Sequence, residues 1–216
     1  MRTKALFVAA ATGITALTTS MAQVYSVNVV GYINLDLQNG FNLVANQLDN
    51  GNGNLIGDVL GDQLPEGSGV FKFVPSLGTY QSLSYSFGSW AGSAEALAET
   101  MAPGEAVFVN SIGASTVTLV GEVMEGAQDV DLPLGFSTFS AVAPVVTDLS
   151  AAEVAFPVED GDSFWVFDAS TQGYVPSSYS FGAWSPAALV LEVGQAAWVN
   201  KITAQTWTRD FTVPRN

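Results

Sequence analysis

Three clusters of carboxylates are the residues whose type and spacing could support catalysis. Two acids facing each other across a cleft are sufficient for glycoside hydrolysis. Most of these acids lie beside Gly or Pro in turn-like stretches, where solvated acidic residues are common. The sequence therefore favours turns over an active site. The clusters are Glu122 with Glu125, Asp129 with Asp131, and Glu159–Asp162.

Other catalytic chemistries lack the residue types that they need. The chain contains no His and no Cys, which excludes His- and Cys-based nucleophilic triads and an ordinary zinc site. The sequence also has no Gly-rich phosphate-binding motif. We therefore predict that the protein is not an enzyme and needs no cofactor, with calcium as the one ion to consider.

Calcium prefers hard oxygen ligands, which Glu159, Asp160 and Asp162 offer in the stretch EDGD. The stretch Asp49–Asn54 offers similar ligands. Neither stretch fits the EF-hand loop, and neither recurs elsewhere in the chain. Because Asn, Asp and Gly are ordinary turn residues, a polar turn is the favoured interpretation of both, with calcium as the alternative.

Aromatic residues provide the remaining candidate site. Trp90 and Trp184 end the related stretches SYSFGSW and SYSFGAW, and Tyr80 and Tyr174 precede them at equal distances. Exposed rings of this kind could stack on sugars, and two equivalent platforms would give avidity on a polymer. The favoured alternative is that the rings fill a core, because aromatic side chains dominate core packing. Strand alternation places Tyr85 and Phe87 on the core face and leaves Trp90 ambiguous.

An internal repeat must position these residues. With a shift of 94 residues, Phe71–Trp90 matches Trp165–Trp184 without a gap, and nine of the 20 positions are identical. Gly104–Asn110 likewise matches Gly194–Asn200, and Gly40–Ala45 matches Gly135–Ser140. Order is kept and spacing barely changes. The sequence therefore predicts two pseudo-symmetric repeats of about 90 residues, found by self-comparison.

Strand signals dominate both repeats. Runs rich in Val, Ile, Thr, Tyr and Phe are bounded by Gly, Asn, Pro and Ser. We therefore expect an all-β fold of sandwich or barrel units, with one short helix in each repeat. Those helices are expected within Asn54–Pro65 and Thr147–Pro157. A hairpin is expected at Asn39-Gly40, because this dipeptide favours tight two-residue turns.

The predicted boundaries are 1–22 for a signal peptide, 23–123 for the first repeat and 124–216 for the second. Thr116–Val123 resembles Ser26–Ile33 and corresponds in position to Thr206–Val213. A strand around 116–123 is therefore expected to be shared between the repeats and to fuse them. The strand containing Val24, Val27, Val29 and Ile33 is long and apolar, so it is a candidate for addition to the sheet edge of another molecule.

The first residues predict export. Arg2 and Lys4 precede an apolar run at Ala5–Leu17, and Ser20 and Ala22 suit a cleavage site. The run is too short to span a bilayer, so cleavage after Ala22 is expected. Removal leaves four basic and 20 acidic residues, a net charge of −16. Because phosphate backbones bind through Lys and Arg, we expect no nucleic-acid partner. We also expect no membrane insertion, because no later stretch is long and apolar enough to span a bilayer.

Several stretches are similar to those of an uncharacterised family of secreted, internally duplicated β-rich proteins found in Verrucomicrobia and related bacteria. The resemblance covers nearly the whole mature chain, and its motifs are structural rather than catalytic. The chain departs from the pattern at its end, RDFTVPRN, where a glycine is missing and no sorting tail follows. The resemblance implies a free or envelope-associated protein. Its stretches are VNVVGYINLDL, GFNLVANQL, SYSFGSW, GEAVFVN and TVTLVGEV.

Together these patterns predict a secreted, non-catalytic structural or adhesive component of the cell envelope or extracellular matrix. It would lie in the periplasm or outside the cell. Its partner would be a second copy of itself, through strand addition, or an extracellular polysaccharide. The alternative function is a carbohydrate-binding module that uses surface tryptophans.

Overall fold

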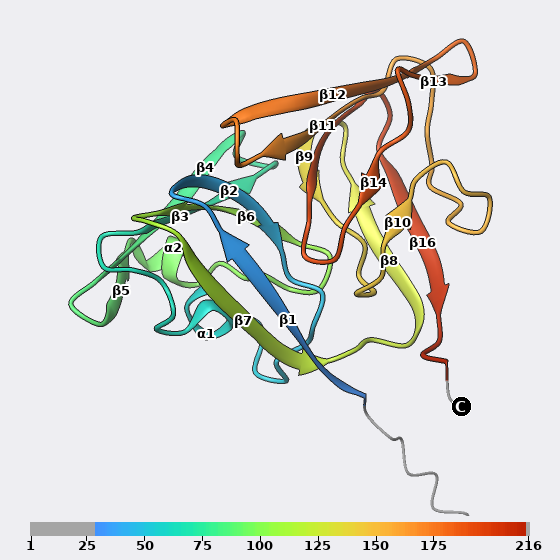
Figure 1. Cartoon of the computed structure of the whole chain (residues 1–216). Helices are drawn as coiled ribbons and strands as arrows, with labels where there is room; N and C mark the ends of the chain where they lie inside the picture. Colours follow the sequence, from blue (N-terminus) through green and yellow to red (C-terminus); the bar gives the residue numbers. More distant parts are fainter. Residues whose placement is uncertain (1–28, 215–216) are drawn as a thin grey trace, which may run out of the picture.

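The computed structural model describes residues 29–214, which form a mostly β structure with two short helices (Figure 1). The predicted all-β class is therefore confirmed. The sheets of this part of the chain are open, which gives a sandwich-like arrangement. The predicted signal peptide, residues 1–22, lies outside the described residues.

The first half of the molecule, residues 29–122, contains seven strands and both helices. Its elements are β1 (Val30–Leu37), β2 (Gly40–Ala45), α1 (Ile56–Leu60), β3 (Gly69–Val74), β4 (Thr79–Ser86), β5 (Ser89–Gly92), α2 (Ala94–Leu97), β6 (Ala106–Ser111) and β7 (Ser115–Glu122).

The second half, residues 126–214, contains nine strands, and two of these have only two residues each. Its elements are β8 (Gly126–Leu132), β9 (Gly135–Phe139), β10 (Thr147–Asp148), β11 (Ser163–Asp168), β12 (Gly173–Ser180), β13 (Ala183–Ser185), β14 (Val190–Leu191), β15 (Ala197–Lys201) and β16 (Gln205–Phe211).

Each half contains one five-stranded antiparallel sheet, and the two sheets have corresponding strand orders. The first is ordered β2-β6-β3-β4-β5 and the second β9-β15-β11-β12-β13. Each half also has a two-stranded sheet, β1-β7 in the first and β8-β16 in the second. The sequence matches described above therefore fall on strands with the same place in their sheets.

Each half encloses its own hydrophobic core. Ile33, Leu35 and Leu37 alternate along β1 and face the first core, together with side chains of β3, β6 and β7. Leu132, Phe164 and Trp207 contribute to the second core from β8, β11 and β16. The inward residues of these strands recur at every second position, as strand geometry requires.

The strand expected to join the repeats, around 116–123, belongs to the first half. It forms β7, which pairs along its whole length with β1. The corresponding strand β16 pairs in the same way with β8. Each half therefore has its own two-stranded ladder. Residues 123–125 connect the two halves.

The helix expected within Thr147–Pro157 is not formed. Thr147 and Asp148 instead form β10, which pairs with β14. The Asp148 carboxylate then accepts hydrogen bonds from the backbone N–H and hydroxyl of Ser150, and single turns follow. Such local side-chain bonds compete with helix formation. The helix expected within Asn54–Pro65 is present as α1, so both helices lie in the first half.

The two halves contact each other through reciprocal backbone hydrogen bonds. The N–H of Ala45 donates to the carbonyl of Gly194 at 2.8 Å, and the N–H of Ser140 donates to the carbonyl of Gly104 at 3.0 Å. Ala45 corresponds to Ser140 in the repeat, and Gly104 corresponds to Gly194. The two bonds therefore join residues that correspond to each other in the sequence match.

Candidate functional site

Ten aromatic side chains lie between the two five-stranded sheets, on the faces that point away from the two cores. In β3, Val70 faces the first core while Phe71 and Phe73 point to the other side. In β11, Phe164 faces the second core while Trp165 and Phe167 point away from it. We call these ten residues the aromatic cluster. They form five equivalent pairs: Phe41 and Phe136, Phe71 and Trp165, Phe73 and Phe167, Tyr80 and Tyr174, and Phe108 and Trp198.

Ring contacts join the cluster across the two halves. Phe73 lies 4.8 Å from Trp198 between ring centroids, and Phe108 lies 5.2 Å from Phe167. These two contacts are equivalent under the repeat and have edge-on geometry, which aromatic pairs prefer over face-to-face stacking. The cluster therefore holds the halves together through the same side chains on both sides.

Two hollows open within the aromatic cluster. The first has a volume of about 440 Å³ and the second about 300 Å³. Five of the six residues that line one hollow have their repeat equivalents in the other, and Tyr174 lines both. No charged side chain lines either one. The first hollow is lined by Phe73, Gly78, Phe136, Trp165, Tyr174 and Trp198, and the second by Phe41, Phe71, Tyr80, Phe108, Phe167 and Tyr174.

The rim of these hollows is exposed. Phe41, Tyr80, Tyr174 and Phe136 have exposed fractions of 41, 43, 50 and 51%. They are two equivalent pairs, so both halves present the same two rings to solvent. Large apolar side chains gathered in this way indicate a contact surface more strongly than apolar side chains scattered over a protein.

The two rim tyrosines have raised pKa values. Burial raises the pKa of Tyr80, and the nearby Tyr174 raises it further. Burial also raises the pKa of Tyr174, and the indole N–H of Trp198 partly offsets this effect. That buried N–H makes no hydrogen bond of normal geometry, so the offset reflects proximity. Both hydroxyls stay protonated at neutral pH and are available as hydrogen-bond donors.

Trp90 and Trp184 are not exposed platforms. Trp90 is half-buried against the first core, donates its indole N–H to the carbonyl of Gly61 at 2.9 Å and contacts Tyr85. Trp184 is half-buried against the second core and contacts Phe164. The rings that sequence analysis paired with Tyr80 and Tyr174 therefore lie on the core side of the sheets. Tyr80 and Tyr174 belong to the aromatic cluster instead.

Phe87 does not face the core, although strand alternation predicted that it would. It lies at the turn between β4 and β5, and its exposed fraction is 98%. Phe181 occupies the corresponding turn between β12 and β13 and is equally exposed. The strand ends at Ser86, where the turn begins, so the alternation does not extend to position 87. The glycine of each Phe-Gly dipeptide is typical of a tight turn, but Phe is an unusual residue at its first central position.

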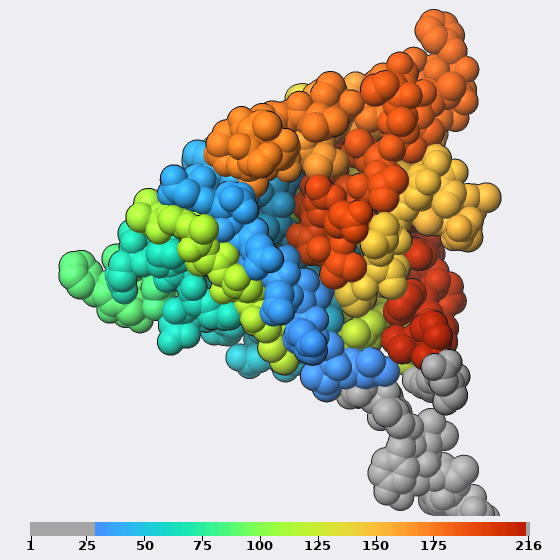
Figure 2. All heavy atoms as spheres, viewed as in Figure 1, coloured from blue at the N-terminus to red at the C-terminus, as the bar shows by residue number. Residues whose placement is uncertain are grey.

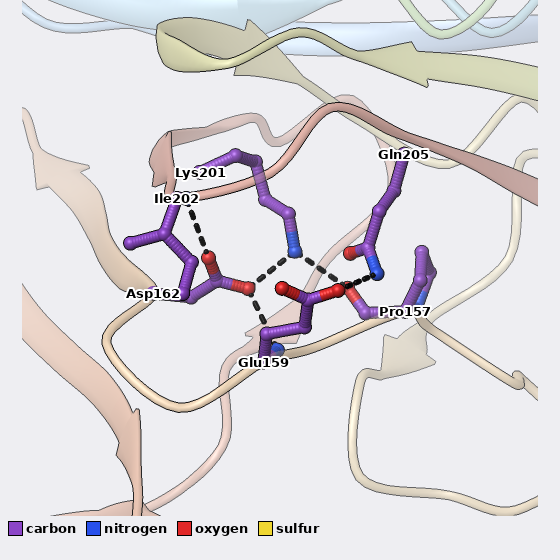
Figure 3. A network of polar contacts seen from close by, with 6 residues as sticks. All are labelled: Pro157, Glu159, Asp162, Lys201, Ile202 and Gln205. Atoms are coloured by element: carbon purple, nitrogen blue, oxygen red, sulfur yellow. Dashed lines mark hydrogen bonds and ion pairs between the residues drawn. The ribbon is translucent and has the colours of Figure 1, made fainter.

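The predicted calcium ligands have separate structural partners. The Asp162 carboxylate forms an ion pair with Lys201 and accepts hydrogen bonds from the N–H groups of Glu159 and Ile202 (Figure 3). The Glu159 carboxylate accepts from Gln205, and Asp160 accepts from the N–H of a turn glycine. Within residues 29–214 no group of acidic side chains has the arrangement of a metal site.

The other acidic clusters also have structural partners. Asp129 and Asp131 project from β8 and accept hydrogen bonds from the hydroxyls of Thr208 and Thr206 on β16. The first half repeats this pattern with Asn34 and Asp36 of β1, paired with Thr118 and Thr116 of β7. Glu125 accepts from the N–H of Val213. These acids support cross-strand pairing.

The strand predicted for assembly is part of the first core. Ile33 is buried. Val29 is half-buried, and its backbone carbonyl accepts a hydrogen bond from the N–H of Val123. Val24 and Val27 lie outside the described residues. Val30 and Tyr32 are the exposed apolar side chains of β1. Removing this strand would uncover the first core, so it is not a detachable arm.

Comparisons with protein-family models, with curated proteins and with solved structures find no match for this chain. The helices of residues 29–214 are too short to cross a bilayer.

Proposed function

We propose that the protein is a non-catalytic structural or adhesive component of the cell exterior that associates with itself through the aromatic cluster. The carrying observation is the exposed rim of Phe41, Tyr80, Phe136 and Tyr174 around two uncharged hollows. Exposed aromatic residues are enriched in protein interfaces because they bury a large area at a small entropic cost. The predicted signal peptide supports a location outside the cytoplasm.

The acidic character of the chain fits this role. Sixteen more acidic than basic residues remain after the predicted cleavage, so molecules repel one another at low ionic strength. The aromatic hollows are free of charged side chains and are the places where two molecules can approach with least repulsion. Added salt screens the repulsion and leaves apolar contacts intact. Association through the cluster should therefore increase with salt, which distinguishes it from association through ion pairs.

Sedimentation velocity over a range of concentrations at low and high salt tests this function. The chain without residues 1–22 should move from monomer to larger species as concentration and salt rise. Substitution of both Phe41→Ser and Phe136→Ser should abolish the shift. Tyr32→Ser is the matched control, because Tyr32 is exposed on β1 outside the cluster, and it should leave association unchanged. A chain that stays monomeric at the highest concentration and salt contradicts the proposal.

Carbohydrate binding is the second candidate function. Its candidate site consists of Tyr80 and Tyr174, because Trp90 and Trp184 lie against the cores. Both rings are exposed beside a hollow, and both hydroxyls can donate hydrogen bonds. Pull-down on insoluble cellulose and chitin tests this candidate. Retention that is lost in a Tyr80→Ala, Tyr174→Ala variant would favour it, whereas no retention by either polymer would count against it.

A further inference from the structure

Phe87 and Phe181 have an unfavourable backbone conformation, and their side chains are almost fully exposed. Their φ angles are 53° and 54°, and the glycines that follow have φ of 70° and 74°. Both are two-residue hairpin turns, because Ser86 pairs with Ser89 and Ser180 pairs with Ala183. Turns with two positive φ values favour Asn, Asp or Gly at the first position. Phenylalanine there is strained.

Neighbouring carboxylates fix these turns. Glu66 accepts hydrogen bonds from the backbone N–H groups of both Phe87 and Gly88. Asp160, from the equivalent place in the second half, accepts from the N–H of Gly182 at 2.9 Å. Each turn is therefore held rigid while its aromatic ring is left 98% exposed. A strained backbone that holds an apolar ring in water is an arrangement expected at a functional site.

The two turns lie at opposite corners of the molecule. The space-filling view shows the β4–β5 hairpin as the green projection on the left and the β12–β13 hairpin as the orange projection at the upper right (Figure 2). The two hairpins project in different directions (Figure 2). Contacts made by both turns would therefore connect a molecule to two others.

We propose that Phe87 and Phe181 insert into the aromatic hollows of neighbouring copies of this chain. The inference rests on the proposed self-association and specifies its contacts. Each molecule offers two projecting rings and two hollows, in numbers that match. The hollows are lined by aromatic side chains without charge, so an aromatic ring can enter one without desolvating a charged group. Because the ring and the hollow are different surfaces, the contact is heterologous and extends into chains.

The expected area of one contact sets its strength. An aromatic side chain buries roughly 150–250 Å², and stable interfaces bury about 1,200 Å² or more in total. A single ring in a hollow is therefore a weak contact. Association should occur at high local concentration, such as at a cell surface, where several contacts act together. Dilute protein should remain monomeric.

Two complementary variants test the inference. The tip variant carries Phe87→Asn and Phe181→Asn and keeps both hollows. The hollow variant carries Phe41→Ser and Phe136→Ser and keeps both tips. Because Asn tolerates the left-handed conformation better than Phe, the tip variant should melt no lower than the parent chain. Each variant alone should sediment as a monomer, whereas an equimolar mixture should form heteromeric species.

A photocrosslinker gives a second readout that does not depend on the folding of the hollow variant. Benzoylphenylalanine in place of Phe87 should form crosslinks between molecules, and these should map by mass spectrometry to the strands that line the hollows, β2, β3, β4, β6, β9, β11, β12 or β15. Crosslinks confined to other segments would overturn the inference. Phe87→Asn and Phe181→Asn should also reduce association to the level of dilute monomer at every salt concentration.

The outcomes separate the inference from the proposed function. A parent chain that associates while the tip variant associates equally overturns the inference and leaves the proposed function standing. A parent chain that never associates overturns both. Flotation with phosphatidylcholine vesicles tests whether the exposed rings bind a lipid surface instead of a second copy of the chain. Vesicle binding that depends on Phe87 and Phe181, without self-association, would assign the tips to a lipid surface and overturn the inference.

Discussion

The two halves of the molecule have the same sheet order but fill their cores differently. Three positions that carry valine in the first half carry an aromatic ring in the second. The pairs are Val44 and Phe139, Val70 and Phe164, and Val117 and Trp207, and all six side chains are buried. The buried core of the first half is therefore almost entirely aliphatic, whereas four of the twelve buried core residues of the second half are aromatic.

The presence of α1 explains this difference. Ile56 and Leu60 of α1 are fully buried against the valines of the first half. The second half has no helix at this place and uses Phe156, which contacts Trp207 at 5.0 Å between ring centroids. Cores tolerate extensive changes when total volume and pattern are kept. The comparison suggests that strand alternation sets the topology, and that a helix or a few rings can complete the core.

The halves also differ in where they place an ion pair. The first half pairs Lys72 with Glu105 at 2.8 Å, and the second half has Val166 and Gln195 at these positions. The second half instead pairs Asp162 with Lys201, both without exposed side-chain area. At those positions the first half has Ser68 and Ser111.

One hydrogen bond is common to both arrangements. The N–H of Ile112 donates to the Ser68 hydroxyl in the first half, and the N–H of Ile202 donates to the Asp162 carboxylate in the second. A neutral hydroxyl thus supports the same loop as a buried carboxylate. The charge at Asp162 is therefore not required for the loop itself.

Lys201→Ser should have the largest effect on stability. It leaves Asp162 buried without its cation, and loss of one partner of a buried pair costs about 3–5 kcal/mol. The double variant Asp162→Ser, Lys201→Ser recreates the first half's residues and should cost less than about half as much, because no charge is left unpaired. Urea unfolding followed by tryptophan fluorescence measures both. Equal losses in the single and double variants would contradict this account.

Trp207→Val should come next. It gives the second half the residue of the first, but no helix is present to fill the space, and the indole N–H also donates to the carbonyl of Val154. Removal of a large buried side chain should cost about 3 kcal/mol. At the equivalent position of the first half, Val117→Ala should lower the free energy of unfolding by less, since it removes a smaller volume. A second half that tolerates valine at 207 without loss in urea unfolding would show that its core is not completed by aromatic rings.

Gly121→Ala should destabilise the first half by a smaller amount. A Cβ atom at 121 would lie 2.4 Å from the carbonyl oxygen of Asp49, which pairs with Glu122 through two backbone hydrogen bonds. The second half has Pro144 in place of Asp49 and Phe211 in place of Gly121. Proline has no N–H, so it cannot donate the bond that Asp49 donates to Glu122. The glycine that the second repeat lacks is thus required only where the bridge forms.

The neighbouring glycine provides the control for this variant. Gly31 pairs directly with Gly121, and a Cβ atom at 31 would meet only side-chain atoms of Leu48 and Val123, at 3.3 Å. Thermal unfolding should show a loss of about 2 kcal/mol for Gly121→Ala and a smaller loss for Gly31→Ala. The reverse order would exclude the close approach of Asp49 as the cause.

The comparison also shows what sequence patterns can predict. Period-two alternation identified the strands, because one face of each packs on a core. The hairpin predicted from the Asn39-Gly40 dipeptide was wrong: β1 pairs with β7 and β2 with β6, so Asn39-Gly40 turns a corner between two sheets. The Asn39 side chain accepts the N–H of Gly113 there. Such a contact between distant residues leaves no local signal.

The candidate site was only partly predictable for a related reason. Strands such as β3 and β11 are apolar on both faces, which predicts burial on both sides. The identity of the second layer is not local, so Trp90 and Trp184 could not be separated from Trp165 and Trp198 by spacing alone. Tyr80 and Tyr174 were found because they precede repeated motifs, whereas Phe87 was misplaced because its strand ends at Ser86.

The smallest predicted effect concerns two equivalent tyrosines. Burial raises the pKa of both Tyr80 and Tyr174, and the charge of ionised Tyr174 raises the pKa of Tyr80 further. Because repulsion between two ionising hydroxyls couples their titrations, Tyr174→Phe should lower the pKa of Tyr80, while burial keeps that pKa above its usual value. NMR titration with ring-labelled tyrosine measures each pKa, and Tyr32→Phe, outside the cluster, should change neither. An unchanged pKa of Tyr80 in the Tyr174→Phe variant would contradict the coupling between the two rings.

The same shifts set the sign of the alkaline pH dependence. An unfolded tyrosine ionises near pH 10, whereas in the folded chain Tyr80 and Tyr174 ionise at higher pH. Above about pH 10 the unfolded state binds fewer protons than the folded state, so stability falls as pH rises through the folded pKa values. Below the unfolded pKa their contribution is fully present. Tyr80→Phe with Tyr174→Phe should flatten the alkaline decline in urea unfolding, and an unchanged slope would place its origin outside the aromatic cluster.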